Sequence, residues 1–423
     1  MTPAPSPPAF GRTPLTSTIP TLLLVSAGDE QYRRYALEQI AARHRVVLLS
    51  PSEPTWEAPY IHGHEVADTS DPDASLAAAE RLAADHHIKG VLTWDEFAQH
   101  TAAHLACRFA TSGNSTATAH TCRDKAASRA AFAAFNVPSA ASVRADTPDQ
   151  ARAAAATIGY PVVLKPAAAA GSIGVSLAAT PKDLTAAFDL ADQAAGDHEH
   201  ATGRCGVLVE EYLDGPEISV ECVTVRGATT PVAVTRKRLG PPPYFEETGH
   251  SVEAGDPLLA LVGPVAVRAL HAVGYANGVS HVEMRLTASG PRLIEVNGRL
   301  AGDLIPHLVR EATGIDLPLA AADIAVGLRP DLTPTRRRAA AIHMAYAPAD
   351  GRLTRATADP ALRHQHWLER LVWEKQPGDH VALPPAGNLG TARVAHLVAT
   401  AATAEICLQH LADAARQLDI TTD

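Results

Sequence analysis

A short stretch near residue 290 constrains the fold more than any other part of the chain. Residues 281–299 read HVEMRLTASGPRLIEVNGR, in which two β-like runs flank a Ser-Gly turn signal. A turn centred on Ser289 would set Glu283 directly opposite Glu295 on one face of an antiparallel pair. Asn297 would share that face, because side chains along a strand repeat with period two.

Two carboxylates held on one sheet face, with Cβ atoms roughly 5 Å apart, would repel each other unless a cation lay between them. Oxygen-only ligands suit Mg²⁺, which takes one or two carboxylates and completes its shell with phosphate oxygens. Arg299 follows just beyond the hairpin, where it could meet an anion near such a metal. The alternative is a solvated hairpin whose charges face water, and this stretch alone does not decide between the two.

Composition narrows the class of protein. The 423 residues predict two to three domains, and the net charge of -10 disfavours a nucleic-acid partner, which normally shows a basic surface. Five cysteines without a C-x-x-C pair indicate reduced thiols. No apolar run approaches the ~18–20 residues needed to span a bilayer, and the Pro-, Ser- and Thr-rich residues 1–19 predict a disordered tail rather than a signal peptide. We expect a cytoplasmic protein without a membrane partner.

The pattern of strands and helices predicts α/β and α+β architecture. Strands alternating with helices over residues 20–114 indicate a small parallel α/β domain. No G-x-G-x-x-G follows its first strand, which excludes a dinucleotide fingerprint. A second unit is expected over 115–328, with a helix across 122–135 and a polar stretch at 196–206 that should be mobile. Two prolines then mark a linker to a smaller C-terminal domain over 329–423.

Two lysines lie where phosphate groups could bind. Lys165 ends a strand before a loop of small residues (167–174), whose backbone N–H groups could close on phosphate oxygens. Lys125 lies at a helix start, where anions are favoured. The P-loop pattern G-x-x-x-x-G-K-[ST] does not occur. Each feature in isolation has an ordinary alternative, a flexible loop or an exposed surface lysine.

A nucleoside could bind along residues 207–221, which resemble a strand, a connector and a second strand. Backbone groups of Glu210 and Leu213 could read an adenine ring, and Glu217 could accept hydrogen bonds from ribose hydroxyls. The ring could be sandwiched by the apolar residues Val163, Val209 and Leu293. As isolated acidic residues, these glutamates would merely form a solvated edge.

Taken in order, these motifs resemble the ATP-grasp superfamily over roughly residues 115–305. The resemblance implies an ATP-grasp fold preceded by a parallel α/β domain, with ATP held between two α+β subdomains, one of them a lid over about 137–213. It implies that the α- and β-phosphates contact Lys125 and Lys165, that the loop around Ser172 closes over the γ-phosphate, and that the nucleoside meets Glu210, Leu213 and Glu217. It also implies Mg²⁺, or Mn²⁺ in its place, held by Glu283, Glu295 and Asn297.

Three further features resemble the carboxylate–amine ligases that join free amino acids into dipeptides, the L-amino acid ligases. They are TWDEF at 93–97, RKRLGPPPYFEETGHSV at 236–252 and NGRLAGDLI at 297–305. D-alanine–D-alanine ligases, in contrast, usually carry proline after the asparagine. The resemblance implies that a carboxylate attacks the γ-phosphate of ATP to give an acyl phosphate, and that an amine then displaces phosphate. Its small-molecule partners would be two amino acids and ATP, and relatives are often homodimers.

Arg299 is the residue expected to be catalytic, because it could stabilise the transferring phosphoryl group and the tetrahedral oxyanion. Glu96 is the candidate for holding a substrate ammonium, although it could equally be a charge at a helix N-terminus. His250 could contact the substrate carboxylate or amine, or be a plain loop histidine, and Lys237 could reach the γ-phosphate. Two other classes stay open: a ligase for another carboxylate and amine, such as a hydroxy acid or a secondary-metabolite peptide, and a nucleotide-binding module without turnover.

Overall fold

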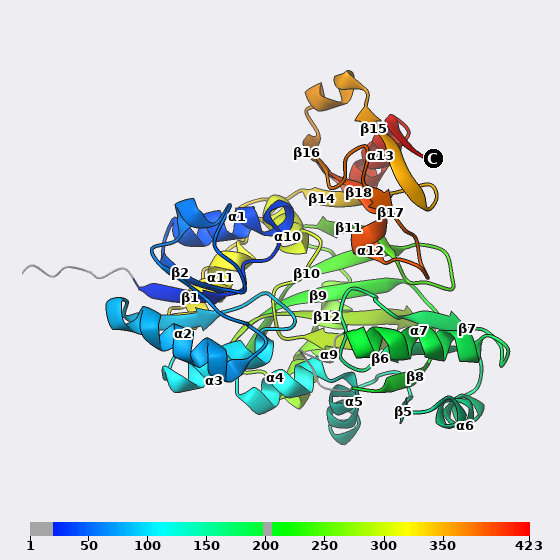
Figure 1. Cartoon of the computed structure of the whole chain (residues 1–423), viewed down its shortest axis with the longest axis horizontal. Coiled ribbons are helices and arrows are strands. Elements are labelled where there is room, and N and C mark those ends of the chain that lie inside the picture. The colour runs from blue at the N-terminus through cyan, green and yellow to red at the C-terminus, as the bar shows by residue number, and fades with distance from the viewer. Residues whose placement is uncertain (1–19, 198–204) are drawn as a thin grey trace, which may run out of the picture.

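The computed structural model describes residues 20–197 and 205–423 of the chain (Figure 1). The expected disordered tail, 1–19, lies outside the described residues, as does most of the stretch 196–206 that was expected to be mobile. All five cysteines are described; they are free, and all but Cys107 are buried. Within the described residues, no helix is both long and apolar enough to cross a membrane.

The N-terminal part is a parallel α/β unit, as the alternation of strands and helices predicts. Its four strands lie in the order β3-β2-β1-β4 and all pair in parallel. The strands are β1 (Thr21–Val25), β2 (Arg45–Ser50), β3 (His64–Val66) and β4 (Ile88–Leu92), and the helices are α1 (Glu30–Ala41), the 3-10 turn η1 (Ala58–Tyr60), α2 (Pro72–Asp85) and α3 (Gln99–Arg108). β1 and β2 are almost wholly buried, which explains their unbroken apolar runs.

The helix expected across 122–135 is in fact two helices, α4 (Thr116–Arg123) and α5 (Lys125–Ala134). Asp124 separates them because its backbone is extended and its side chain caps α5 by accepting a hydrogen bond from the N–H of Ala127. The break makes Lys125 the first residue of α5 and directs its side chain into the cavity described below.

A second, antiparallel sheet in the order β5-β8-β6-β7 forms a lobe within residues 137–213. Its elements are β5 (Ser142–Ala145), α6 (Pro148–Ile158), β6 (Val162–Pro166), β7 (Ser176–Ala178), α7 (Leu184–Asp197) and β8 (Val207–Glu211). One hydrophobic cluster joins α6 and α7 to these strands, and it includes Val162, Leu164 and Phe188. The lobe thus has a core of its own.

The central sheet has eight strands in the order β13-β12-β9-β10-β11-β14-β18-β16. They are β9 (Glu217–Val225), β10 (Ala228–Leu239), β11 (Glu247–Glu253), β12 (Gly278–Thr287), β13 (Gly290–Asn297), β14 (Ala339–Tyr346), β16 (Leu368–Trp373) and β18 (Arg393–Ala401). The helices that accompany it are α9 (Leu259–Ala272), α10 (Ile305–Thr313) and α11 (Leu317–Ala325), and α11 also packs against α1 and β4 of the N-terminal unit.

The C-terminal residues share the central sheet, although the linker prolines predict a separate domain. β14 pairs with β11 across the expected boundary at 329, and β18 and β16 follow it. The remaining elements are β15 (Gly351–Ala358), η2 (Pro360–His364), β17 (His380–Val381), α12 (Leu389–Ala392), α13 (Ala404–Ala415) and β19 (Leu418–Thr422). β15, β17 and β19 form a small sheet beside them, visible in orange and red in Figure 1.

In the hairpin of β12 and β13, Glu283 pairs with Glu295 as predicted. A β-bulge in β13 produces this register. Thr287 pairs with Gly290 across a two-residue turn, and the register shifts by one residue between Glu283 and Met284. The extra residue on β13 is Ile294, which turns toward the cavity beside Glu295.

Two of the three apolar residues expected to sandwich an adenine ring are not placed to do so. Leu293 and Val209 do not face the cavity: each is fully buried in a hydrophobic cluster, whereas Val163 lines the cavity as expected. An unbroken period of two would have kept Leu293 on the face of Glu295 and Asn297. Ile294 takes that place because the bulge interrupts the alternation.

Candidate active site

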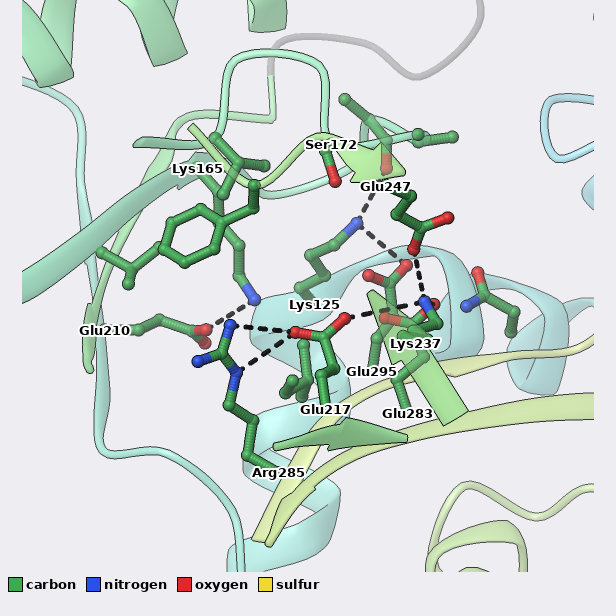
Figure 2. Close-up of a pocket in the computed structure, with 18 of the residues that line it drawn as sticks. Lys125, Lys165, Ser172, Glu210, Glu217, Lys237, Glu247, Glu283, Arg285 and Glu295 are labelled. Carbon is green, nitrogen blue, oxygen red and sulfur yellow. Dashed lines mark hydrogen bonds and ion pairs between the residues drawn. The ribbon is translucent and has the colours of Figure 1, made fainter. Parts of the chain in front are cut away.

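A cavity lies between the lobe of β5–β8 and the central sheet, and charged side chains converge on it from both (Figure 2). Apart from Val209 and Leu293, all the expected site residues line it except Glu96 and His250. Its basic residues are Lys125, Arg129, Lys165, Lys237, Arg285 and Arg299, and its acidic residues are Glu210, Glu211, Glu217, Glu247, Glu283, Glu295 and Asp303.

The metal-binding prediction concerns the acidic face of the hairpin. Glu283, Glu295 and Asn297 all line the cavity, and the two carboxylates are held by ammonium groups. The Nζ atom of Lys237 lies 2.9 Å from Glu283, and that of Lys125 lies 3.2 Å from Glu295. Three oxygen donors on one wall, two of them anionic, fit the ligand preference of Mg²⁺. The donor set therefore suits the ion that the resemblance implies.

His281 orients the carboxylate of Glu283, a role that sequence reasoning missed. Its Nε2 lies 2.9 Å from Glu283, and its Nδ1 lies 2.9 Å from Glu221 on β9. Burial lowers the pKa of His281, but Glu221 and Glu283 outweigh burial and raise the pKa to about 9. This shift favours the protonated ring, which can donate to both carboxylates. The spacing could have revealed this contact, because His281 and Glu283 are two apart on one strand.

The expected phosphate-binding lysines, Lys125 and Lys165, also line the cavity. The Nζ of Lys125 donates to the carbonyl oxygen of Ala169 at 2.8 Å, and the Nζ of Lys165 lies 2.5 Å from Glu210. Burial would raise the pKa of Glu210, but Arg129 and Lys165 outweigh burial and hold it at about 2. The Glu210 side chain thus fixes two cations, and only its backbone is left for the expected contact with adenine.

The loop between β6 and β7 contains residues in the left-handed region. Gly171, Ser172 and Gly174 all have φ between 57 and 73°. A Cβ at Gly174 would lie 2.5 Å from the Cβ of Ala194, so the close approach of the loop to α7 requires glycine there. Ser172 lines the cavity from this loop.

Glu217, which was expected to bind the nucleoside, is held in place by Arg285, a residue that was not singled out from the sequence. Arg285 on β12 bonds the carboxylate of Glu217 at 3.1 Å, and its guanidinium lies 5.5 Å from the ring centroids of Tyr212 and Phe245. Burial, and then the neighbouring carboxylates, outweigh Lys237 and Arg285 and raise the pKa of Glu217. Leu213, one of the residues expected to contact the nucleoside, lines the cavity, as does Tyr212, which was not singled out from the sequence.

Glu96 lies behind the cavity and binds two arginines. Its Oε2 accepts from Nε of Arg299 at 2.5 Å, and its Oε1 accepts from Arg123 at 2.9 Å. Arg123 also donates to the carbonyl oxygen of Ala168 in the loop after β6. This placement differs from the expectation that Glu96 holds a substrate ammonium, because Glu96 does not line the cavity. Instead, Glu96 orients Arg299, which lines the cavity.

The buried Glu96 carboxylate should link stability to pH. Burial raises its pKa, but Arg299 and Arg123 outweigh burial and bring it from 4.5 to about 2. One pKa unit corresponds to about 1.4 kcal/mol, so Glu96→Gln should lower the free energy of unfolding at pH 7 by about 3 kcal/mol. Because the folded-state pKa is depressed, this contribution is present above pH 4.5 and is lost as the pH falls towards 2.

Urea unfolding of the wild type and of Glu96→Gln across this pH range measures the difference. Glu30→Gln is the control, since that carboxylate pairs with Arg34 on the exposed surface of α1. A stability gap between the wild type and Glu96→Gln that stays constant from pH 7 to pH 2 would contradict the assignment.

Two carboxylates, Glu247 on β11 and Asp303 after β13, face the cavity beyond Lys237. The Nζ of Lys237 bonds Glu247 at 2.5 Å, and the fully buried His250 reaches both carboxylates through Nε2 at 3.3 Å. Burial raises the pKa of Asp303, but Arg393 outweighs burial and keeps it well below its usual range. Both groups therefore accept hydrogen bonds, and a ligand ammonium could bind there. Neither Glu247 nor Asp303 was singled out from the sequence.

Comparison with known proteins agrees with this geometry. Residues 158–307 match the ATP-grasp domain, and residues 343–423 match the L-amino acid ligase C-terminal domain 2. A solved structure of L-amino acid ligase from Bacillus licheniformis superposes with a TM-score of 0.79, at 18% sequence identity, over 96% of this chain and 99% of that one. At that identity the superposition shows the fold, with its parallel N-terminal sheet and antiparallel sheets beyond.

Two curated relatives are similar in sequence. The uncharacterized protein y4rH of Sinorhizobium fredii is 30% identical over 336 residues, which are 78% of this chain and 69% of that protein. The alanine–anticapsin ligase of Bacillus subtilis is 29% identical over 225 residues, or 49% of this chain. The chain spans about half of that ligase, 47% of its length. The chain therefore belongs to the ATP-grasp superfamily, as an ATP-dependent ligase that forms a C–N bond and carries the C-terminal domain of L-amino acid ligases.

Proposed function

We propose that the protein joins two amino acids into a dipeptide, with ATP converted to ADP and phosphate. The observation that carries this proposal is the set of groups that line one cavity. They are the lysines expected to bind phosphate, the oxygen donors of the hairpin, and the carboxylates Glu247 and Asp303 with Arg299. Lys237 joins the hairpin to these carboxylates, because its Nζ pairs with both Glu283 and Glu247. Such a cavity could hold ATP beside a substrate that carries both a carboxylate and an ammonium.

In the first step, a substrate carboxylate oxygen would attack the γ-phosphorus, and the bond to the ADP oxygen would break to give an acyl phosphate. Lys125 and Lys165 would bind the phosphates, and Glu283, Glu295 and Asn297 would hold Mg²⁺. When bound, the metal offsets the charge of the phosphate oxygens. The chain contributes positioning and charge neutralisation rather than a covalent intermediate.

In the second step, the amine of the other amino acid would attack the acyl carbon. The new C–N bond forms as the acyl C–O bond breaks, phosphate leaves, and the amine loses a proton. Arg299 would stabilise the tetrahedral oxyanion, because its guanidinium lines the cavity and Glu96 fixes its orientation. We propose that the ammonium of one amino acid lies between Glu247 and Asp303, in place of the role first expected for Glu96.

A coupled assay of ADP release across pairs of amino acids, with mass spectrometry of the products, tests the proposal. We expect ADP release to rise only when two amino acids are present, and the product mass to equal their sum less one water. ADP release with a single carboxylate and no amine would contradict dipeptide formation. Nucleotide binding without any turnover would instead indicate a binding module.

A further inference from the structure

Arg393 is a buried charge from the C-terminal residues that lies directly behind the proposed amino-acid subsite. It is the first residue of β18, its side chain is 2% exposed, and it does not line the cavity. Its guanidinium forms a two-pronged pair with Asp303, with Nη1–Oδ1 at 2.6 Å and Nη2–Oδ2 at 2.9 Å. An arginine held in this way fixes both the position and the plane of the carboxylate.

The backbone of Glu247, the second acidic residue of the subsite, is held from the same side. The backbone carbonyl oxygen of Glu247 accepts hydrogen bonds from Nη2 of Arg393 at 3.1 Å and from the hydroxyl of Tyr346 at 2.9 Å. Nε of Arg393 lies 3.2 Å from the same hydroxyl. Tyr346 and Arg393 are paired residues on β14 and β18. One strand pair therefore holds the carboxylate of Asp303 and the backbone of Glu247.

The backbone at Asp303 requires such support. Asp303 has φ of 49° and Leu304 has φ of 60°, so two successive residues other than glycine adopt the left-handed conformation. Conformations of this kind persist only where the surroundings over-determine them. Arg393 bonds the side chain at this point, and Leu304 is almost fully buried beside it.

We propose that Arg393 is a positioning residue for the amino-acid subsite, through which the C-terminal residues set the places of Asp303 and Glu247. The inference rests on the proposed function for the identity of the ligand. The predicted effect of Arg393 on the backbone around Asp303 is independent of the proposed function. Arg393 would act without touching the substrate, because its donors are taken by Asp303, Glu247 and Tyr346.

Steady-state kinetics of Arg393→Met should separate the two substrates. We expect the KM for the amino acid bound by Glu247 and Asp303 to rise roughly 10- to 100-fold, since displacing positioned groups by about 1 Å has effects of this size. The KM for ATP should change by less than about twofold, because Lys125 and Lys165, the lysines proposed to bind phosphate, pair with Glu295 and Glu210 rather than with Glu247 or Asp303. Arg393→Lys keeps the positive charge but cannot form the two-pronged pair with Asp303. Its KM for the amino acid should therefore lie between those of the wild type and Arg393→Met.

Arg338→Met is the matched control. Arg338 also joins the C-terminal residues to the rest of the protein, where it pairs with Glu311 at the end of α10, away from the cavity. Loss of this pair should leave both KM values near those of the wild type. Equal KM values for the amino acid in Arg393→Met and Arg338→Met would overturn the proposal, as would a parallel rise in the KM for ATP.

Hydrogen exchange supplies a readout that needs no turnover. Amides of residues 300–305 should exchange faster in Arg393→Lys than in the wild type and in Arg338→Met, and unchanged exchange would overturn the inference. This measurement also serves if Arg393→Met does not fold. If wild-type protein releases no ADP with amino acids, the proposed function fails while the exchange experiment still decides the role of Arg393.

Discussion

Replacing Arg299 with alanine is expected to lower kcat by roughly 10²–10³, by analogy with the loss of an oxyanion donor. The side chain lines the cavity, while Nε is fixed by Glu96 and Nη1 donates to the carbonyl oxygen of Leu300. It is therefore held before any substrate arrives, which is the condition under which an electrostatic contact favours the transition state. The KM for ATP should change far less than kcat.

The rate is measured as ADP release at saturating substrates. Arg310→Ala is a suitable control, because Arg310 lies on α10 beside Asp316 and does not line the cavity. Arg299→Lys should recover only part of the rate, since an ammonium cannot keep both contacts of the guanidinium. Turnover of Arg299→Ala at the wild-type rate would rule out the catalytic role.

Removing either carboxylate that is proposed to hold the metal should lower kcat as much as, or more than, the Arg299→Ala substitution. Glu283→Gln and Glu295→Gln are each expected to lower kcat by about 10³-fold or more, because a bound metal supplies several kcal/mol of charge stabilisation in phosphoryl transfer. In each variant an ammonium, that of Lys237 or Lys125, also loses an anionic partner. Chelation of the metal should abolish the wild-type activity.

The dependence of the rate on Mg²⁺ concentration distinguishes metal binding from general damage. The half-saturating concentration should rise in both variants, whereas Glu253→Gln, which alters a carboxylate on β11 that caps α13 at Ala404, should leave it unchanged. Variants that lose activity but keep the wild-type Mg²⁺ dependence would show that these carboxylates do not hold the ion.

Local sequence patterns predicted the parts of the site that lie within one hairpin or one strand–loop unit. Glu283 and Glu295 were placed opposite each other by a turn signal and a period of two, and they do pair. Lys165 was predicted to line the site because it ends a buried strand that is followed by a loop of small residues. In both cases the geometry depends on neighbours in the sequence, which period and turn chemistry describe well.

Local sequence patterns did not predict contacts between segments that are distant in the sequence. Glu96 and Arg299 are 203 residues apart, so nothing in the TWDEF stretch indicates that its glutamate orients an arginine after β13. Likewise, the pairing of β11 with β14 joins segments about ninety residues apart, and proline spacing suggested a boundary where a sheet continues. The bulge at Ile294 is local, yet no turn residue marks it, and the face assigned to Leu293 was wrong for that reason.

The shared central sheet has a practical consequence for building hybrid ligases. A cut near residue 329 looks natural in the sequence, but it would strip β14 from β11 and leave Gly249–Glu253 with open backbone N–H and C=O groups along a long edge. Exposed edges of this kind recruit other chains, so a truncated protein should aggregate. Exchange of the lobe that holds β5–β8 would break isolated bridges, Ser139 with Leu293 and Ser176 with Tyr244, rather than a full strand pairing, so this lobe is the safer module to graft.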